Sequence, residues 1–263
     1  MSRPIPTHDY VTHFEPAQAR HRAWLQAALE RLVDHEPEAL VEGGPLLRLW
    51  SSASAEAAGA QAEAPIGASD RPYPNPLVGV PYFQQRDSAQ LSQRDRTCFS
   101  SSCAMLLVAL KPGTLQGANG DDQYLAVVQR NGDTTDAGAQ LQALAHFGVT
   151  ARLVQAADFQ LIKQQIAGGI PVPCGTIHRG PVERPTGSGH WLIVYGHTPT
   201  HLVVNDPWVE PDLLSGATIN ANGMGLQFSR QNFGKRWMVE PIGGEAYRHA
   251  PRKGWAVVVD GVG

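Results

Sequence analysis

The order of hydrophobic patterns in the second part of the chain limits the choice of fold. Helical spacing of apolar residues comes first, in residues 100–110, 121–130, 135–147 and 158–167. Strand-like patterns follow, in the sequences IPVPCGTI, HWLIVYGH and HLVVNDP. LVGVPYF ahead of the helices predicts an entering strand, and WAVVVDGV near the end predicts a last one. Helices followed by an antiparallel sheet are typical of the α+β class, which is the fold class that we expect.

Changes in composition divide the chain into four parts: residues 1–50, 51–77, 78–240 and 241–263. The first part holds strong helix formers with apolar residues three and four apart, which predicts an amphipathic helix. Such a helix is not stable alone, so we expect it to dock on a protein partner or to oligomerise. The second part, rich in Ala, Ser, Gly and Pro, is expected to be a linker, with an alanine-rich helix over residues 53–64 as the alternative. The last part is a C-terminal extension that ends in a strand.

The composition argues against several classes of protein. With 42% hydrophobic and 17% charged residues, a chain of 263 residues can bury a core. A net charge of −3 argues against affinity based on neutralising phosphates, so no nucleic-acid partner is expected. No apolar run approaches the ~20 residues that span a bilayer, which predicts no membrane span. The N-terminal sequence has no apolar stretch of the signal-peptide kind, so we expect synthesis in the cytoplasm.

Cys98 is the first candidate for chemistry. It stands immediately before the predicted helix in RDRTCFSSSCAMLL. There the unpaired N–H groups and the positive end of the helix dipole favour a thiolate. Cys103 lies five residues later, inside the apolar helix, and is expected to be a small core residue that cannot form a disulfide with Cys98 without distortion. A cysteine alone is more often structural than catalytic, so Cys98 needs partners.

His190 and Asp206 are the expected partners of this thiol. GSGHWLIVYG places His190 at the entrance of one strand, and HLVVNDP places Asp206 at the exit of the next. If the two strands are antiparallel and joined near residues 196–200, the two side chains are neighbours. The carboxylate can then hold one tautomer of the imidazole, which acts as a base toward a nucleophile.

Acyl transfer also needs a donor for the oxyanion of the tetrahedral intermediate. Gln85, upstream of Cys98 in VPYFQQRD, can supply a side-chain amide. Gln84 is its competitor, because the alternation of the predicted strand does not decide between the two residues.

Two groups of residues raise the question of a metal. Cys174 and His178 are four apart, but no second Cys/His pair completes a zinc site. Asp121, Asp122 and the segment 132–136 lack the register of a calcium loop and suit helix caps better. We therefore expect no metal.

Two further features suit the wall of a cleft. Residues 175–189 are rich in Gly and Pro and are expected to form a long loop along it. Trp191, Trp208 and Trp237 are expected to be core or cleft-wall aromatics rather than a sugar platform.

The segments VPYFQQRDS, TCFSSSCAM, PTGSGHWLIVYG and VVNDP together resemble a known family. It is the bacteriocin-processing (double-glycine) type of papain-like cysteine peptidase, in particular its stand-alone relatives. The resemblance covers residues 78–239. It implies a papain-like fold in which an N-terminal helical lobe packs its central helix on an antiparallel sheet. It also implies that Gln85 is the oxyanion donor, Cys98 the nucleophile, His190 the base and Asp206 its orienting residue, and that no cofactor is needed.

Phe99 and Ser100 depart from the family, which usually has Gly-Pro after the nucleophile. Phe99 is expected to narrow the cleft or to change which peptide fits, and it leaves an inactive relative open. No Gly-rich P-loop or membrane part accompanies the motifs, so removal of a leader peptide during export is not the default function.

The expected function is hydrolysis of a peptide bond by a cysteine peptidase. Cross-linking peptides of the bacterial cell wall are one substrate class, for a cytoplasmic or a phage- or virion-associated enzyme. The alternatives are a peptide-binding module without activity and an acyl transferase that uses the same thioester.

Overall fold

The computed structural model describes residues 73–238 and 253–263. These residues belong to the second of two units of the chain, which begins at Arg71. The predicted N-terminal helix and nearly all of the predicted linker lie outside the described residues.

Helices dominate the first part of the described chain and strands the second. The helices are α4 (Cys98–Leu110), α5 (Gly120–Asn131), α6 (Ala137–His146), α7 (Phe159–Ala167) and α8 (Arg230–Trp237), with the 3₁₀ turns η2 (Gln85–Asp87) and η3 (Leu91–Gln93) ahead of them. The strands are β1 (Val149–Ala157), β2 (Val172–Arg179), β3 (Thr186–His197), β4 (His201–Asn205), β5 (Glu210–Pro211), β6 (Thr218–Asn220), β7 (Leu226–Ser229) and β8 (Gly254–Val262).

Six of these strands form one antiparallel sheet in the order β1-β8-β2-β3-β4-β7. The predicted C-terminal strand is confirmed as β8, and it lies inside the sheet between β1 and β2. The sheet therefore extends beyond the residue range 78–240 that the motifs delimit. β5 and β6 form a separate small hairpin.

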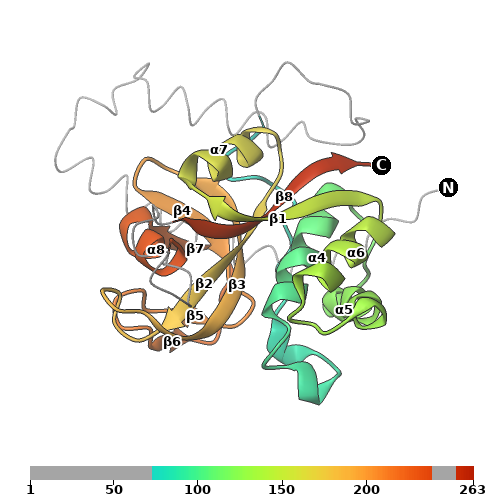
Figure 1. The fold of residues 1–263 in the computed structure, drawn as a ribbon, viewed down its shortest axis with the longest axis horizontal. Helices are drawn as coiled ribbons and strands as arrows, with labels where there is room; N and C mark the ends of the chain where they lie inside the picture. Colours follow the sequence, from blue (N-terminus) through green and yellow to red (C-terminus); the bar gives the residue numbers. More distant parts are fainter. Residues whose placement is uncertain (1–72, 239–252) are drawn as a thin grey trace, which may run out of the picture. The chain divides into compact units, whose positions relative to one another are not determined.

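Helices cover both faces of the sheet. In Figure 1, α4, α5 and α6 group on one side of the sheet and α8 lies on the other. Alternation along β3 explains the division: Trp191 and Ile193 pack with α4–α6, whereas Leu192 and Val194 pack with α7 and α8. The longest buried helix, α4, packs on β3 and β2. The α+β class and a central helix on an antiparallel sheet are thus confirmed.

The predicted entering strand over residues 77–83 is wrong. This segment is extended but belongs to no strand. Pro76 and Pro81 lack the N–H that a ladder requires, and Gly79 takes a positive φ of 77°. Leu77 nevertheless donates a backbone hydrogen bond to Tyr195 of β3, which fixes the path of the segment along the sheet.

The predicted long loop over residues 175–189 is also wrong. Most of it is a β-hairpin, because β2 continues to Arg179 and β3 begins at Thr186. Gly180 in the turn and Gly187 in the first part of β3 take positive φ angles. The apolar patterns of β1, β5, β6, β7 and α8 are short or interrupted by polar residues, and none of these elements was predicted.

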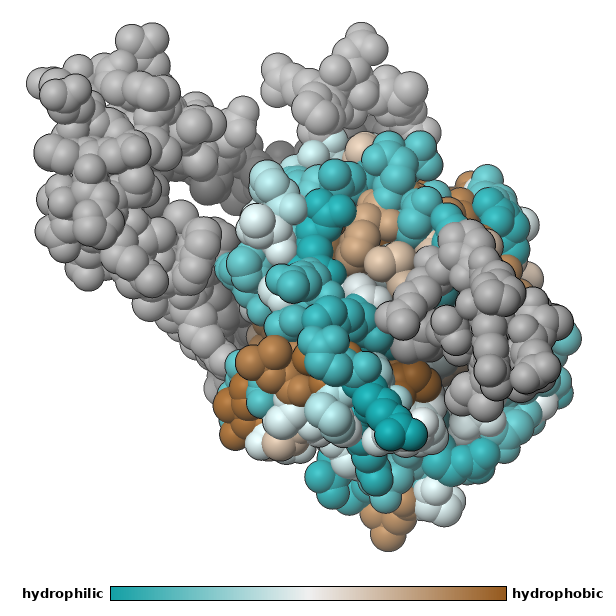
Figure 2. Space-filling model, turned by 60° about the vertical axis from the view of Figure 1, so that its left-hand side comes forward, coloured by the Kyte–Doolittle hydropathy of each residue, from teal (hydrophilic) through white to brown (hydrophobic). Residues whose placement is uncertain are grey.

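The described surface is mostly hydrophilic in the view of Figure 2, where hydrophobic residues form separate patches. Large apolar side chains that are exposed are Tyr73, Val78, Leu91, Leu214, Ile219 and Trp255. Among the described helices, none combines the length and the apolar character needed to cross a bilayer.

Candidate active site

Cys98 is the first residue of α4 rather than the residue before it. Thr97 precedes the helix as its N-cap, and its side chain makes no capping hydrogen bond. The backbone N–H groups of the first turn therefore point out of the helix end beside the Cys98 thiol. Cys98 is half-buried, whereas Cys103 and Cys174 are buried, and all three are free thiols.

His190 and Asp206 lie together, as their places on neighbouring strands predict. β3 and β4 are antiparallel and pair Ile193 with Asn205, which brings the residues just outside this pair to one end of the hairpin. His190 Nε2 lies 2.7 Å from Asp206 Oδ1. Both side chains are nearly removed from solvent, with exposed fractions of 9% and 2%.

The surroundings of His190 favour its protonated form. Burial by itself lowers the pKa of His190, but the charge and hydrogen bond of Asp206, together with interactions with Cys98, raise it to about 10. The thiol at the start of α4 is thus close enough to the imidazole of β3 to influence its charge. The structure brings Cys98, His190 and Asp206 into one cluster.

Backbone and amide groups hold Asp206 in place. Its Oδ1 also accepts from the N–H of Trp208 at 2.9 Å, and its own N–H donates to the carbonyl of Gly223 at 2.8 Å. Next to it, the Asn205 side chain donates to the Pro81 carbonyl and accepts from the N–H of Gly225. The turn after β4 is thereby tied to two other segments of the chain.

The structure distinguishes the two glutamines that the sequence left open. Gln85 is buried; its Nε2 donates to the carbonyl of Arg94 at 2.8 Å, and its Oε1 has no partner among the described residues. The backbone N–H of Gln85 also donates to the carbonyl of Pro207, beside Asp206. Gln84 instead donates its side-chain amide to the carbonyl of Ala221. Gln85 therefore lies next to the Asp206 turn and keeps one amide hydrogen unassigned.

The expectation that Phe99 narrows the cleft is wrong. Its side chain is 3% exposed and stacks on Trp191, with ring centroids 3.7 Å apart. Because successive helix residues point about 100° apart, Phe99 enters the core while Cys98 stays at the helix end. The stack joins α4 to β3 directly beside His190.

The metal alternatives do not lead to a site in the described residues. Cys174 is buried in the core between the sheet and α7 and α8, where burial raises its pKa. Asp121 and Asp122 accept hydrogen bonds from Ser101 and Ser88, both at 2.5 Å. No group of three or more His, Cys, Asp or Glu residues is placed to hold a metal ion in this part of the chain.

His178 is the neighbour that the sequence reading missed. Its ring centroid lies 5.3 Å from that of His190. Cross-strand pairing of Thr176 with His190 predicts this contact once the register of β2 and β3 is known, but the sequence alone does not give the register.

The three tryptophans divide between core and surface. Trp191 and Trp237 are buried. Trp208 is half-buried, with the guanidinium of Arg86 4.8 Å from its ring centre.

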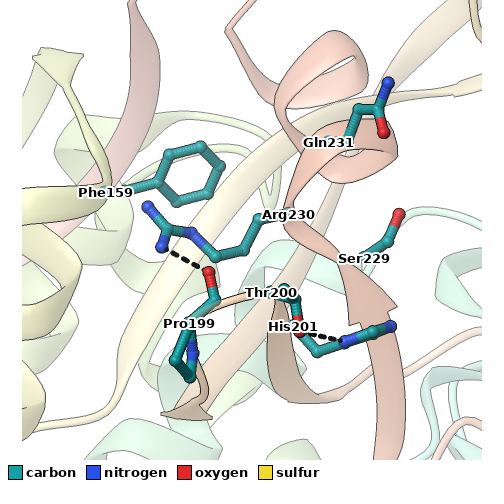
Figure 3. Close-up of a pocket in the computed structure, with 7 residues that line it drawn as sticks. All are labelled: Phe159, Pro199, Thr200, His201, Ser229, Arg230 and Gln231. Carbon is teal, nitrogen blue, oxygen red and sulfur yellow. Dashed lines mark hydrogen bonds between the residues drawn. The ribbon is translucent and has the colours of Figure 1, made fainter.

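A hollow of about 510 Å³ lies away from the cluster. Figure 3 shows it between the β3–β4 turn and the start of α8, at the end of β4 opposite Asp206; the lining side chains are Phe159, Pro199, Thr200, His201, Ser229, Arg230 and Gln231. Arg230 is already engaged there, since it donates to the carbonyl of Pro199 and lies over Phe159.

The chain matches solved structures, but it matches no family model and no curated protein. The peptidase domain of Streptococcus ComA, a bi-functional ABC transporter involved in a quorum-sensing pathway, is 18% identical, with 63% of this chain and 91% of that chain covered and a TM-score of 0.38. A C39-like peptidase from Bacillus anthracis is 14% identical, with 68% and 94% covered and a TM-score of 0.42.

The peptidase domain of Streptococcus mutans ComA is 19% identical, with 48% of this chain and 75% of that chain covered and a TM-score of 0.29. The chain is thus similar to solved peptidases and peptidase domains, at TM-scores below 0.5. Because all three identities are low, a role for any residue of this chain has to come from its own geometry.

Proposed function

We propose that this protein is a cysteine peptidase that hydrolyses a peptide bond. Cys98 is the nucleophile, His190 the base and acid, Asp206 the residue that orients His190, and Gln85 a donor to the oxyanion. The observation that carries the proposal is the buried His190, which Asp206 holds at 2.7 Å and which interacts with the thiol at the start of α4.

The chemistry follows from the hydrogen bonds of His190. Because Asp206 occupies Nε2, Nδ1 is left to exchange a proton with Cys98. The Cys98 sulfur attacks the carbonyl carbon, and the proton now on His190 passes to the departing amine. A water molecule, deprotonated by His190, then attacks the thioester and releases the acid with Cys98 regenerated.

Two kinds of donor are available to the oxyanion. The backbone N–H of Cys98 is at the helix start, where it has no partner within the helix. The second amide hydrogen of Gln85 is the other donor, since Arg94 takes only one. Donors fixed before the reaction stabilise the developing negative charge most effectively.

The rate of iodoacetamide labelling of Cys98 as a function of pH tests the thiolate–imidazolium pair. In the wild type we expect Cys98 to be labelled well below pH ~8.5, the pKa of a free cysteine. In His190→Ala we expect this labelling at low pH to disappear. Mass spectrometry assigns the label, and the buried Cys103 and Cys174 serve as internal controls that stay unlabelled in the folded protein.

Hydrolysis is measured next, on peptide libraries and on cell-wall peptides, with Cys98→Ser as the inactive control. If Cys98 labels like an ordinary thiol in both proteins, the peptidase proposal is wrong. A different outcome would identify an acyl transferase: Cys98 is labelled at low pH, but the acyl group is transferred to an added amine and no hydrolysis occurs.

The alternative of a binding module without activity has lost its main support. It depended on Phe99 beside the thiol, and that side chain is buried against Trp191. For the substrate we propose a peptide, with cross-linking peptides of the bacterial cell wall as the first class to test.

A further inference from the structure

His178 packs against the His190 imidazole on the face of the sheet that α8 covers. The two side chains, from neighbouring strands β2 and β3, have ring centroids 5.3 Å apart and ring planes inclined at 53°. Thr176, Asp206 and Arg236 line the same small hollow. His178 is therefore a neighbour of His190 distinct from Asp206 and Cys98.

The hydrogen bonds of His178 fix one neutral tautomer. The Nε of Arg179 lies 3.2 Å from His178 Nε2, and since a guanidinium can only donate, Nε2 must accept. His178 Nδ1 lies 3.0 Å from the carbonyl oxygen of Ser188, which can only accept, so Nδ1 carries the hydrogen. Both ring nitrogens are used, and a second proton on Nε2 would have to break the bond from Arg179.

Arg236 of α8 holds the strand on both sides of His178. Its buried guanidinium donates to the carbonyls of Ile177, Arg179 and Gly180, and also to that of Leu213. These bonds fix the backbone immediately before and after His178. A side chain on a backbone held in this way keeps its ring in one position.

The charges around His178 keep it neutral. Burial lowers the pKa of His178, the positive charges of His190 and Arg179 lower it further, and the Ser188 carbonyl and Asp206 raise it, with a result of about 4. Arg236 faces the same space and adds positive charge. At neutral pH the ring beside the His190 imidazolium therefore carries no charge that would repel it.

We propose that His178 is a positioning residue for His190, a neutral ring that keeps the imidazole aligned between Asp206 and Cys98. This inference rests on the proposed function, because alignment matters only if His190 exchanges a proton with Cys98. His178 lies against the His190 ring, so its effect passes through His190.

Labelling of Cys98 by iodoacetamide separates this role from a purely structural one. In His178→Ala we expect the rate near pH 6 to fall about tenfold, because a base out of alignment loses an order of magnitude or more. At a pH above about 9.5, where a cysteine ionises without help, the rate should stay within about twofold of the wild type. General unfolding would change the two rates together and would also label Cys103 and Cys174.

Two further variants serve as controls for His178→Ala. His178→Phe keeps a neutral ring without the hydrogen bonds of His178, and its Cys98 should be labelled near pH 6 at most of the wild-type rate. His201→Ala removes a histidine at the far end of β4 and should label like the wild type. If His178→Ala does not fold, His178→Phe and the tautomer measurement below decide the matter.

The ¹⁵N chemical shifts of the His178 ring in the wild-type protein report the tautomer directly. We expect Nδ1 protonated, Nε2 unprotonated and no titration between about pH 5 and pH 8, well away from the ordinary histidine value. Titration in this range, or unchanged low-pH labelling in His178→Ala, would overturn the inference. If the wild type itself lacks the low-pH labelling that depends on His190, the proposed function fails instead.

Discussion

His190 and Asp206 form a charged pair that is almost completely removed from water. Such a pair is stable only while both partners are present, since removal of one leaves a buried charge without compensation. The hydrogen bond from Trp208 to the same carboxylate oxygen adds to its stabilisation. The ion pair therefore depends on these few contacts.

Replacement of Asp206 by asparagine, Asp206→Asn, tests this dependence. The amide keeps the shape of the side chain but loses the negative charge that raises the pKa of His190. The pKa of His190 should therefore fall. We expect peptide hydrolysis to drop by about two to four orders of magnitude, as when the acid of a catalytic triad is replaced. The low-pH part of Cys98 labelling should move upward in pH; an unchanged profile would exclude Asp206 as the orienting residue.

Asp121 gives a prediction about stability rather than activity. It is buried beside Ser101 of α4, and burial raises its pKa to about 7. The folded protein thus binds a proton that the unfolded chain releases near pH 4. The protonated Asp121 therefore contributes fully to the free energy of unfolding below pH ~4, and the contribution is lost as the pH rises toward 7.

Asp121→Asn should therefore be more stable than the wild type at pH 8 and lose this advantage at pH 4. The gain should not exceed a few kcal/mol, at ~1.4 kcal/mol per unit of pKa difference. Urea unfolding at the two pH values measures it. Asp133→Asn is the control: the pKa of the exposed Asp133 is lowered to about 2, mainly by hydrogen bonds from Thr135, so its effect should vary much less between these pH values.

The element that places Asp206 is the turn after β4, which packs against the segment around Gly223. The N–H of Gly223 donates to the Tyr82 hydroxyl, and its carbonyl accepts from the N–H of Asp206. A Cβ atom at Gly223 would collide with the Asp206 carbonyl oxygen. The backbone at this point has no room for a side chain.

Gly223→Ala should therefore displace Asp206 while the rest of the sheet stays folded. We expect the low-pH labelling of Cys98 to fall about tenfold, because a small displacement of an orienting group costs at least that much. Gly261→Ala is the control, since a Cβ there meets nothing within 4 Å. Equal labelling in both variants would show that the turn adjusts freely.

At the scale of the whole described sheet, stability depends on the position of β8 between β1 and β2. β1 pairs with β8 and with no other strand of the sheet, so the last residues of the chain join β1 to the remaining strands. Ala256, Val257 and Val258 of β8 are at most 3% exposed and contact the helices on both faces. The two cores therefore share this strand.

Deletion of residues 253–263 should abolish cooperative unfolding. Burial of each large apolar side chain contributes about 1.5–3 kcal/mol, and a domain is stable by only about 5–15 kcal/mol in total. Thermal unfolding followed by circular dichroism checks this. Asp260→Asn, which removes only an exposed ion pair with Arg152, should change the stability by less than about 1 kcal/mol; a folded deletion variant would contradict the central role of β8.

The candidate cluster could be predicted from the sequence because its signals are local. A cysteine at a helix start, a histidine in one strand and an aspartate at the exit of the next each follow from short apolar patterns. The antiparallel hairpin then requires the last two to be neighbours. Helix capping also depends on residues close in the sequence. Asp136, for example, is the N-cap of α6 and accepts a hydrogen bond from the N–H of Gly138.

Other features depend on contacts between residues far apart in the chain. Phe99 stacks on Trp191, Gln84 and Gln85 donate to different carbonyls, those of Ala221 and Arg94, and His178 lies beside His190 because of the register of β2 and β3.

Spacings of a few residues are thus enough to predict the helical and strand patterns of the main elements and the residue types that suit the chemistry. The place of residues 254–262 inside the sheet and the position of His178 against His190 are visible only in the folded chain. Strand order, register and burial come from packing across the whole sheet, and no local pattern specifies them.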